Sequence, residues 1–149
     1  MLGAIIGDMV GSVYEFNNTK RTDFPLFTPQ SVYTDDSIMT IAVADWLLSD
    51  ETLRHEVLES KMARYAYAFP NPMGGYGGNF SKWLFGPGPR RPYGSWGNGS
   101  AMRVSAIGWM YNTLEQTLDA AEESASITHN HPEGIKGAQA TDYRIRTQF

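Results

Sequence analysis

The sequence contains no cysteine among its 149 residues. This excludes a disulfide framework, a thiolate zinc site and a cysteine nucleophile, and it is compatible with the reducing cytoplasm, where we expect the protein. Long apolar runs are also missing, because the stretch from Leu2 to Val13 is interrupted by Asp8 and is too short to span a membrane. No Lys or Arg precedes that stretch, so it makes a poor signal peptide, and we expect no membrane attachment.

Positive charge is scarce as well: 12 Lys and Arg stand against 16 Asp and Glu, a net charge of -4. This balance argues against a general nucleic-acid binder, whose affinity depends on neutralising phosphates with basic side chains. A small phosphate-bearing ligand stays compatible if a metal ion or backbone N–H groups supply the positive field. The length predicts a single domain over residues 1–149.

Helical periodicity dominates the chain, and no segment shows a clear alternation of apolar and polar residues, so we expect an all-α fold. The first segment is apolar on most sides, which places it at the centre of a helix bundle, although Ala4-Ile5-Ile6 by itself leaves a strand open. Loops are expected at 17–33 and 70–100, the second being rich in glycine, proline and aromatic residues. The expected helices span 2–16, 34–48, 51–68, 79–85, 100–111 and 113–128, with another starting at 130–133.

The first chemical motif is Thr34-Asp35-Asp36, at the start of a predicted helix. Three adjacent oxygen-bearing side chains can converge on a hard cation such as Mg²⁺, Mn²⁺ or Ca²⁺. The alternative is an ordinary helix cap followed by a solvated acidic turn. Glu15 could complete a metal site if the fold brings it to this turn.

Two glycine-rich stretches form a second group of motifs. In Gly97-Asn98-Gly99-Ser100, glycines flank Asn98 at a helix start, which exposes backbone N–H groups to phosphate or ribose oxygens. The alternative is a tight turn followed by a cap. In the run from Gly74 to Gly78, Tyr76 could stack on a nucleotide base or pack against the domain.

Two of the three histidines, His129 and His131, fall in the segment that ends at Gly134. Their spacing across a turn is not that of a helical zinc pair, so a substrate-orienting donor is the better functional interpretation. A helix cap is the structural alternative.

Together these motifs resemble the ADP-ribosylglycohydrolase family, which includes dinitrogenase-reductase-activating glycohydrolases and ADP-ribosyl-acceptor hydrolases. Their order and approximate spacing also agree, and the resemblance covers about residues 1 to 141. The matching segments are Gly3-Ala4-Ile5-Ile6-Gly7-Asp8, Gly11-Ser12, Tyr14-Glu15, Thr34-Asp35-Asp36-Ser37, Gly74-Gly75-Tyr76-Gly77-Gly78, Gly97-Asn98-Gly99-Ser100-Ala101-Met102-Arg103 and Thr128-His129-Asn130-His131-Pro132-Glu133-Gly134.

The resemblance implies an all-α enzyme that uses two Mg²⁺ or Mn²⁺ ions to hydrolyse the glycosidic bond between ADP-ribose and an acceptor such as arginine or serine. By position it implies a structural role for Asp8 and makes Glu15 or Asp36 the candidate catalytic base. The implied metal ligands are Glu15, Thr34, Asp35 and Asp36. The implied substrate contacts are Gly97, Asn98, Gly99, Ser100 and His129, with Tyr76 added from the reasoning above.

The chain also departs from the family pattern. Family members supply a second acidic cluster of the Asp-x-Asp-Thr/Ser type from their C-terminal half, whereas Asp119 and Asp142, the only aspartates here after Gly99, belong to no such motif. The segment 142–149 breaks the small, apolar pattern before it and is expected to be an aberrant tail. The alternatives to an active hydrolase are therefore an inactive ADP-ribose-binding domain and a structural domain. A second copy of the chain could cover the missing half.

Overall fold

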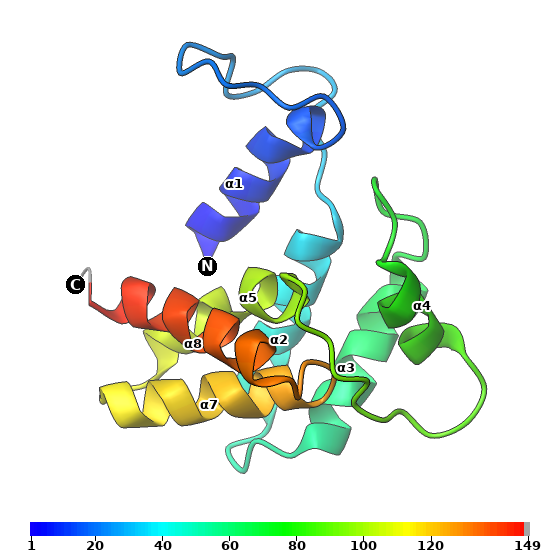
Figure 1. Ribbon diagram of the computed structural model, residues 1–149, viewed down its shortest axis with the longest axis vertical. Helices are drawn as coiled ribbons and strands as arrows, with labels where there is room; N and C mark the ends of the chain where they lie inside the picture. Colours follow the sequence, from blue (N-terminus) through cyan, green and yellow to red (C-terminus); the bar gives the residue numbers. More distant parts are fainter. Residues whose placement is uncertain (148–149) are drawn as a thin grey trace.

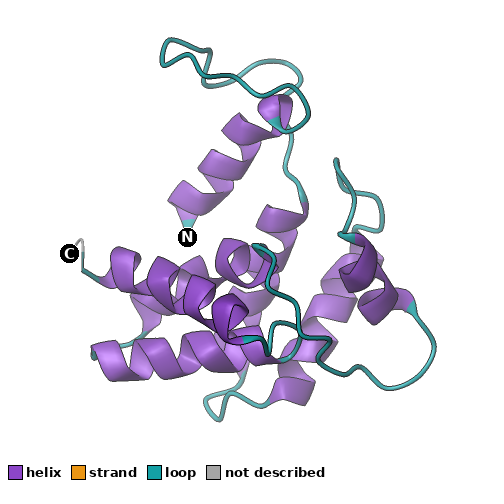
Figure 2. Cartoon of the chain, viewed as in Figure 1, coloured by secondary structure: helices purple, strands orange, loops and turns teal. Residues whose placement is uncertain are grey.

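The computed structural model describes residues 1–147 and confirms the all-α class, since no strand occurs within that range. None of its helices is long and apolar enough to cross a membrane. Figures 1 and 2 show the helices and the long loops between them. The helices are α1 (Leu2–Gly11), α2 (Asp35–Ser49), α3 (His55–Ala68), α4 (Gly78–Phe85), α5 (Gly99–Arg103), α6 (Ile107–Met110), α7 (Leu114–Ser126) and α8 (Pro132–Arg146), with short 3-10 turns at Ser12–Tyr14 and Val104–Ala106.

The centre of the fold is α2, which packs against α3 on one side and α5 on another. It buries side chains on most of its circumference, and Met39, Val43 and Trp46 have no exposed surface. The helices α7 and α8 pack on each other and, through α8, against α5. This arrangement brings the start of α2, the start of α5 and the turn between α7 and α8 to one region of the molecule, although they are far apart in sequence (Figure 1).

Three predicted helix starts are confirmed by their caps. The hydroxyl of Thr34 accepts a hydrogen bond from the backbone N–H of Asp36, and the hydroxyl of Thr113 accepts one from Gln116. Pro132 occupies the first turn of α8, where its missing N–H costs nothing, and the ring of His131 caps that helix. Local sequence was sufficient here because a cap depends on residues only two or three positions apart.

Two predicted helices differ from those observed. The helix expected at 100–111 is broken into α5, a 3-10 turn and α6. The helix expected from residue 51 begins at His55, after a turn in which Leu53 has a φ of 53°, a left-handed conformation that a helix does not allow.

The placement of the first helix at the centre of the bundle is wrong. No residue of α1 is buried, and the Cβ positions of Gly3, Gly7 and Gly11 have nothing within 4 Å. Figure 1 shows α1 and the loop after it at the edge of the molecule, and α1 contacts the bundle mainly through α2. Apolar composition predicts that a helix is buried, but it does not say that the covering surface belongs to the same chain.

The segment 142–149 was expected to be an aberrant tail, and the described part of it continues α8 through Arg146. Asp142 is fully buried, and its Oδ1 accepts a hydrogen bond from the backbone N–H of Gly108 at 3.1 Å. Burial raises the pKa of Asp142 to about 8. Residues 148 and 149 lie outside the described residues.

Candidate functional site

The acidic start of α2 is held in place by Asp8 of α1. The Asp8 carboxylate accepts hydrogen bonds from the backbone N–H of Thr34 at 2.9 Å and from its hydroxyl at 2.6 Å. It also accepts from the N–H and the hydroxyl of Ser37. Asp8 therefore has the structural role expected of it, because its oxygens are used to join two helices across 26 positions of sequence.

The other acidic side chains at this turn form a concentrated region of negative charge. Burial, followed by repulsion from Asp36, Glu15 and Asp8, raises the pKa of Asp35 to about 7. Burial, followed by repulsion from Asp8 and Glu15, raises the pKa of Asp36 to about 6. Glu15 also lines one hollow together with Thr34 and Asp36, so the fold has brought it to the acidic turn.

Glu15 is also close to the loop that precedes α4. A Cβ atom on Gly74 would stand 3.1 and 3.2 Å from the two carboxylate oxygens of Glu15. Gly74 has a φ of +78°, which glycine adopts at little cost. An isolated parallel bridge between Thr34 and Met73 draws the same loop to the start of α2.

These residues suit divalent cations in their chemistry, because Mg²⁺ and Mn²⁺ prefer oxygen donors and a cation would relieve the repulsion between the carboxylates. Within residues 1–147, however, no three acidic or histidine side chains are arranged as a metal cluster. Among the four predicted ligands, Thr34 already uses its hydroxyl in a hydrogen bond, which it donates to Asp8. The metal site thus stays a prediction.

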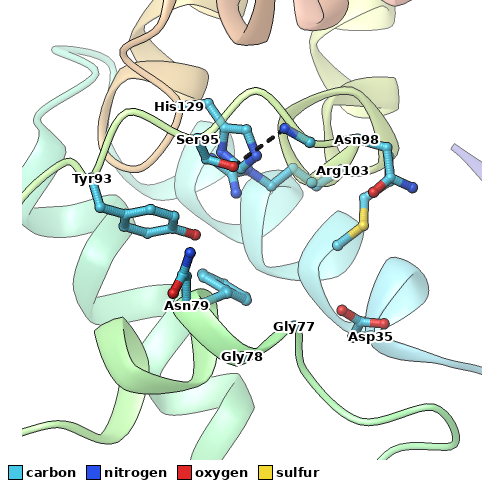
Figure 3. A pocket seen from close by; sticks show the side chains of 13 residues that line it. Asp35, Gly77, Gly78, Asn79, Tyr93, Ser95, Asn98, Arg103 and His129 are labelled. Atoms are coloured by element: carbon cyan, nitrogen blue, oxygen red, sulfur yellow. Dashed lines mark hydrogen bonds between the residues drawn. The ribbon is translucent and has the colours of Figure 1, made fainter.

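A cleft of about 280 Å³ opens beside this acidic turn (Figure 3). Asp35 lies at one end of it and Tyr93 at the other, with Gly77 and Gly78 along one side. A second hollow, of about 340 Å³, is lined by Glu15, Asp36 and two glycines of the first helix, Gly7 and Gly11. Asn98 lines both, so this glycine-flanked asparagine lies where the cleft and the acidic hollow meet.

The structure separates the two candidate histidines. His131 caps α8, since its Nδ1 accepts a hydrogen bond from the N–H of Glu133 at 3.1 Å. His129 is nearly buried and lines the cleft. Burial, assisted by the nearby charge of Arg103, lowers the pKa of His129 to about 4, so its ring is neutral at pH 7. The histidine that caps α8 and the histidine that lines the cleft are thus two different residues.

Some of the remaining predicted substrate residues line the cleft and others do not. Gly97, Asn98 and Gly99 line the cleft, whereas Ser100 is fully buried and donates its hydroxyl to the backbone oxygen of Gly134 at 2.7 Å. Tyr76 is outside the cleft lining: its hydroxyl donates to the backbone oxygen of Phe69, and its ring contacts other aromatic side chains, Phe80 and Phe85.

The cleft contains side chains that the motif reasoning did not select. Tyr93 and Ser95 come from the loop before Asn98, and both donate their backbone N–H to the carbonyl oxygen of Thr128. Arg103 lies just behind the cleft and is almost completely buried. The one signal that pointed to it was its place at the end of the Gly97–Arg103 motif.

The model of the ADP-ribosylglycohydrolase family matches residues 1–146 of the chain. The chain belongs to the ADP-ribosylglycohydrolase family. Its match includes the acidic turn, both glycine-rich loops and the segment containing His129. The residues that line the cleft and the acidic hollow lie within the matched range.

Within this family the chain is similar to proteins named ADP-ribosylhydrolase ARH3. It is 34% identical to that of Mus musculus over 93% of the chain and 45% of the relative. It is 32% identical to that of Homo sapiens and 27% identical to that of Xenopus tropicalis, covering 46% of each. The chain thus spans about half the length of the curated relatives it matches.

Proposed function

We propose that the chain forms the nucleotide-facing part of a hydrolase that cleaves the glycosidic bond between ADP-ribose and an acceptor on a protein or small molecule. The observation that carries the proposal is Asn98, which lines both the glycine-bordered cleft and the hollow containing Glu15 and Asp36. A ligand seated in the cleft can therefore extend past Asn98 to the carboxylates. The family match and the names of the relatives support this substrate class.

The acidic residues then have two roles in the proposal. Glu15, Asp35 and Asp36 would hold Mg²⁺ or Mn²⁺, with Thr34 contributing if its hydroxyl can serve both Asp8 and a cation. When bound, such ions supply a positive field for the diphosphate and polarise a water molecule or a ribose hydroxyl. A carboxylate beside the ions would accept the proton of the attacking water, and Asp36 or Glu15 is the candidate for this base.

The cleft residues would bind and orient the nucleotide. The amide of Asn98 and the neighbouring backbone N–H groups can bond to ribose and phosphate oxygens, as short glycine-rich loops do elsewhere. His129, neutral at pH 7, can act as a donor to a ribose hydroxyl. Tyr76 packs among aromatic residues and would support the loop beside Asp35. Burial, followed by the nearby charge of Asp35, raises the pKa of Tyr76 to about 12.

The direct test measures release of free ADP-ribose from ADP-ribosylated serine and arginine peptides by chromatography, with Mg²⁺, with Mn²⁺ and with a chelator. We expect release that depends on the cation and is lost in Asp36→Asn. Calorimetry with ADP-ribose should show binding that Asn98→Ala weakens about tenfold, which corresponds to the loss of about 1.4 kcal/mol.

The same pair of measurements separates the alternatives. Binding without release would favour a domain that holds ADP-ribose but does not turn it over, which is consistent with the chain spanning about half of its relatives. Neither binding nor release would leave a structural role and overturn the proposal.

A further inference from the structure

His129 is joined to a buried arginine through one hydroxyl group. Arg103 directs Nη2 at the carbonyl oxygen of Ser124, at 2.7 Å, and at the hydroxyl oxygen of Thr128, at 3.0 Å. The same Thr128 oxygen lies 2.7 Å from Nδ1 of His129. All three side chains in this chain of contacts are buried, so no bulk water competes for the bonds.

The direction of each bond follows from what each group can do. A guanidinium only donates, so the Thr128 oxygen must accept from Arg103. The pKa of Arg103, although burial lowers it to about 10, keeps the group charged at pH 7. The hydroxyl of Thr128 then has a single proton left to give, and the contact described for it besides Arg103 is Nδ1 of His129.

We propose that Arg103, acting through Thr128, is a positioning residue that holds His129 in the tautomer with the proton on Nε2 and presents this N–H to the nucleotide cleft. If Nδ1 carried the proton instead, two donors would meet the Thr128 oxygen and its buried hydroxyl proton would face no acceptor described at this position. An unmade bond of a buried polar group is costly, so this arrangement is disfavoured.

The surroundings of the ring keep Nε2 at the cleft. A Cβ on Gly99 would stand 3.2 Å from Nε2 and 3.0 Å from Cε1, so the glycine leaves space for the imidazole edge. At the base of the side chain, a Cβ on Gly134 would stand 3.0 Å from the Cβ of His129. The backbone of Thr128 is itself fixed, because its carbonyl oxygen accepts from the N–H groups of Tyr93 and Ser95.

The chemical consequence is a neutral donor at a defined position. An Nε2–H group can donate to a hydroxyl or phosphate oxygen of a ligand, whereas the other tautomer would present a lone pair, which can accept from a hydroxyl but repels a phosphate oxygen. The benefit to ADP-ribose binding rests on the proposed function, but the tautomer itself does not, since it is set by contacts within the protein.

The test uses ¹⁵N-labelled protein and two-bond imidazole correlations, which show which ring nitrogen carries the proton. The chain has three histidines, so His129→Gln assigns the signal. We expect the Nε2–H pattern at pH 7, with Nδ1 accepting a hydrogen bond. Thr128→Val should shift the Nδ1 resonance toward that of a nitrogen without a bond and raise the Kd for ADP-ribose about tenfold.

Matched variants separate positioning from folding. Thr128→Ser keeps the hydroxyl and should restore the wild-type Nδ1 resonance and Kd. Ser124→Ala removes a buried hydroxyl but leaves the carbonyl oxygen that Arg103 contacts, so it should leave both readouts unchanged. Arg103→Lys tests the donor itself and should move the Nδ1 resonance if the variant folds.

Two results would overturn the inference: a proton on Nδ1 in the wild type, or an Nδ1 resonance that Thr128→Val leaves unchanged. If ADP-ribose does not bind to the wild type, the proposed function fails, while the ¹⁵N measurement still decides the tautomer.

Discussion

The carboxylate of Asp8 and the hydroxyl of Thr34 are joined by a hydrogen bond of 2.6 Å, which links α1 to the first residue before α2. The same carboxylate accepts from Ser37, so one side chain orients the whole acidic turn. The geometry of Asp35 and Asp36 therefore depends on a residue of another helix. Asp8 thus supports the site by positioning the acidic turn, and this role requires no contact with a ligand.

We expect Asp8→Ala to lower the free energy of unfolding by about 2–4 kcal/mol, because several part-buried donors lose a charged acceptor. Chemical denaturation measures this change. Asp23→Ala is the control, since Asp23 is exposed and pairs with Arg21 at the surface. Equal effects of the two substitutions would contradict the anchoring role.

The repulsion among the carboxylates predicts an unusual dependence of stability on pH. The pKa of Asp35, about 7, lies above its ordinary value of 3.8, so the folded state holds a proton that the unfolded state releases. Stability from this group is therefore present below about pH 4 and is lost as the pH rises to about 7. In cation-free buffer, Asp35→Asn should gain stability over the wild type across this window, by on the order of 1 kcal/mol after solvent screening. Denaturation at several pH values checks this, and a constant difference between the two proteins would contradict it.

Divalent cations should reverse this destabilisation. We expect Mg²⁺ or Mn²⁺ to raise the Tm at pH 8, with a gain of about 2.7 kcal/mol when the free cation is 100 times its Kd. Asp36→Asn should abolish the gain, whereas Asp45→Asn, which removes a carboxylate paired with Lys61 and Arg64, should retain it. A scanning-fluorimetry series against cation concentration measures the effect. Identical shifts in both variants would indicate nonspecific binding.

Two glycines of α8 provide a matched pair. An alanine at either position gains about 1 kcal/mol of helix propensity. At Gly137 the new Cβ would meet only the Cβ of Ala101, at 3.9 Å, so Gly137→Ala should be stabilising. At Gly134 it would stand 2.6 Å from the carbonyl oxygen of Ser95, so Gly134→Ala should be destabilising by about 1–3 kcal/mol. The opposite signs in one denaturation experiment are the expected outcome, and a stabilising Gly134→Ala would show that the Ser95 loop yields easily.

The exposed apolar surface predicts self-association, in which a second copy of the chain would cover this surface. Leu2 is 73% exposed and Leu48 is 81% exposed, and Leu48 lines an apolar groove together with Met1 and Leu47. Light scattering at increasing protein concentration should show a dimer or larger species. Leu48→Glu should shift the protein toward monomer, while Leu114→Glu, at an exposed position of α7 outside the groove, serves as a control for added charge. A monomer at all concentrations would contradict this prediction.

The sequence predicted where each motif lies along the chain, but only partly which motifs meet in space. Thr34, Asp35 and Asp36 could be placed at a helix start because capping is a local property. That Glu15 approaches them, and that Asn98 lies between two hollows, required the packing of α1, α2 and α5. Tyr76 and Tyr93 show the limit clearly: both are aromatic residues in glycine-rich loops, and only the fold decides which of them lines the cleft.

By itself the sequence determined the all-α class, the family and the caps of α2, α7 and α8, because these depend on composition, motif order and contacts a few residues apart. Only the tertiary structure decided that α1 is exposed, that His129 lines the cleft, and that Arg103 reaches His129 through Thr128. Those features depend on contacts between residues up to dozens of positions apart, and no local pattern in the chain encodes which distant surfaces meet.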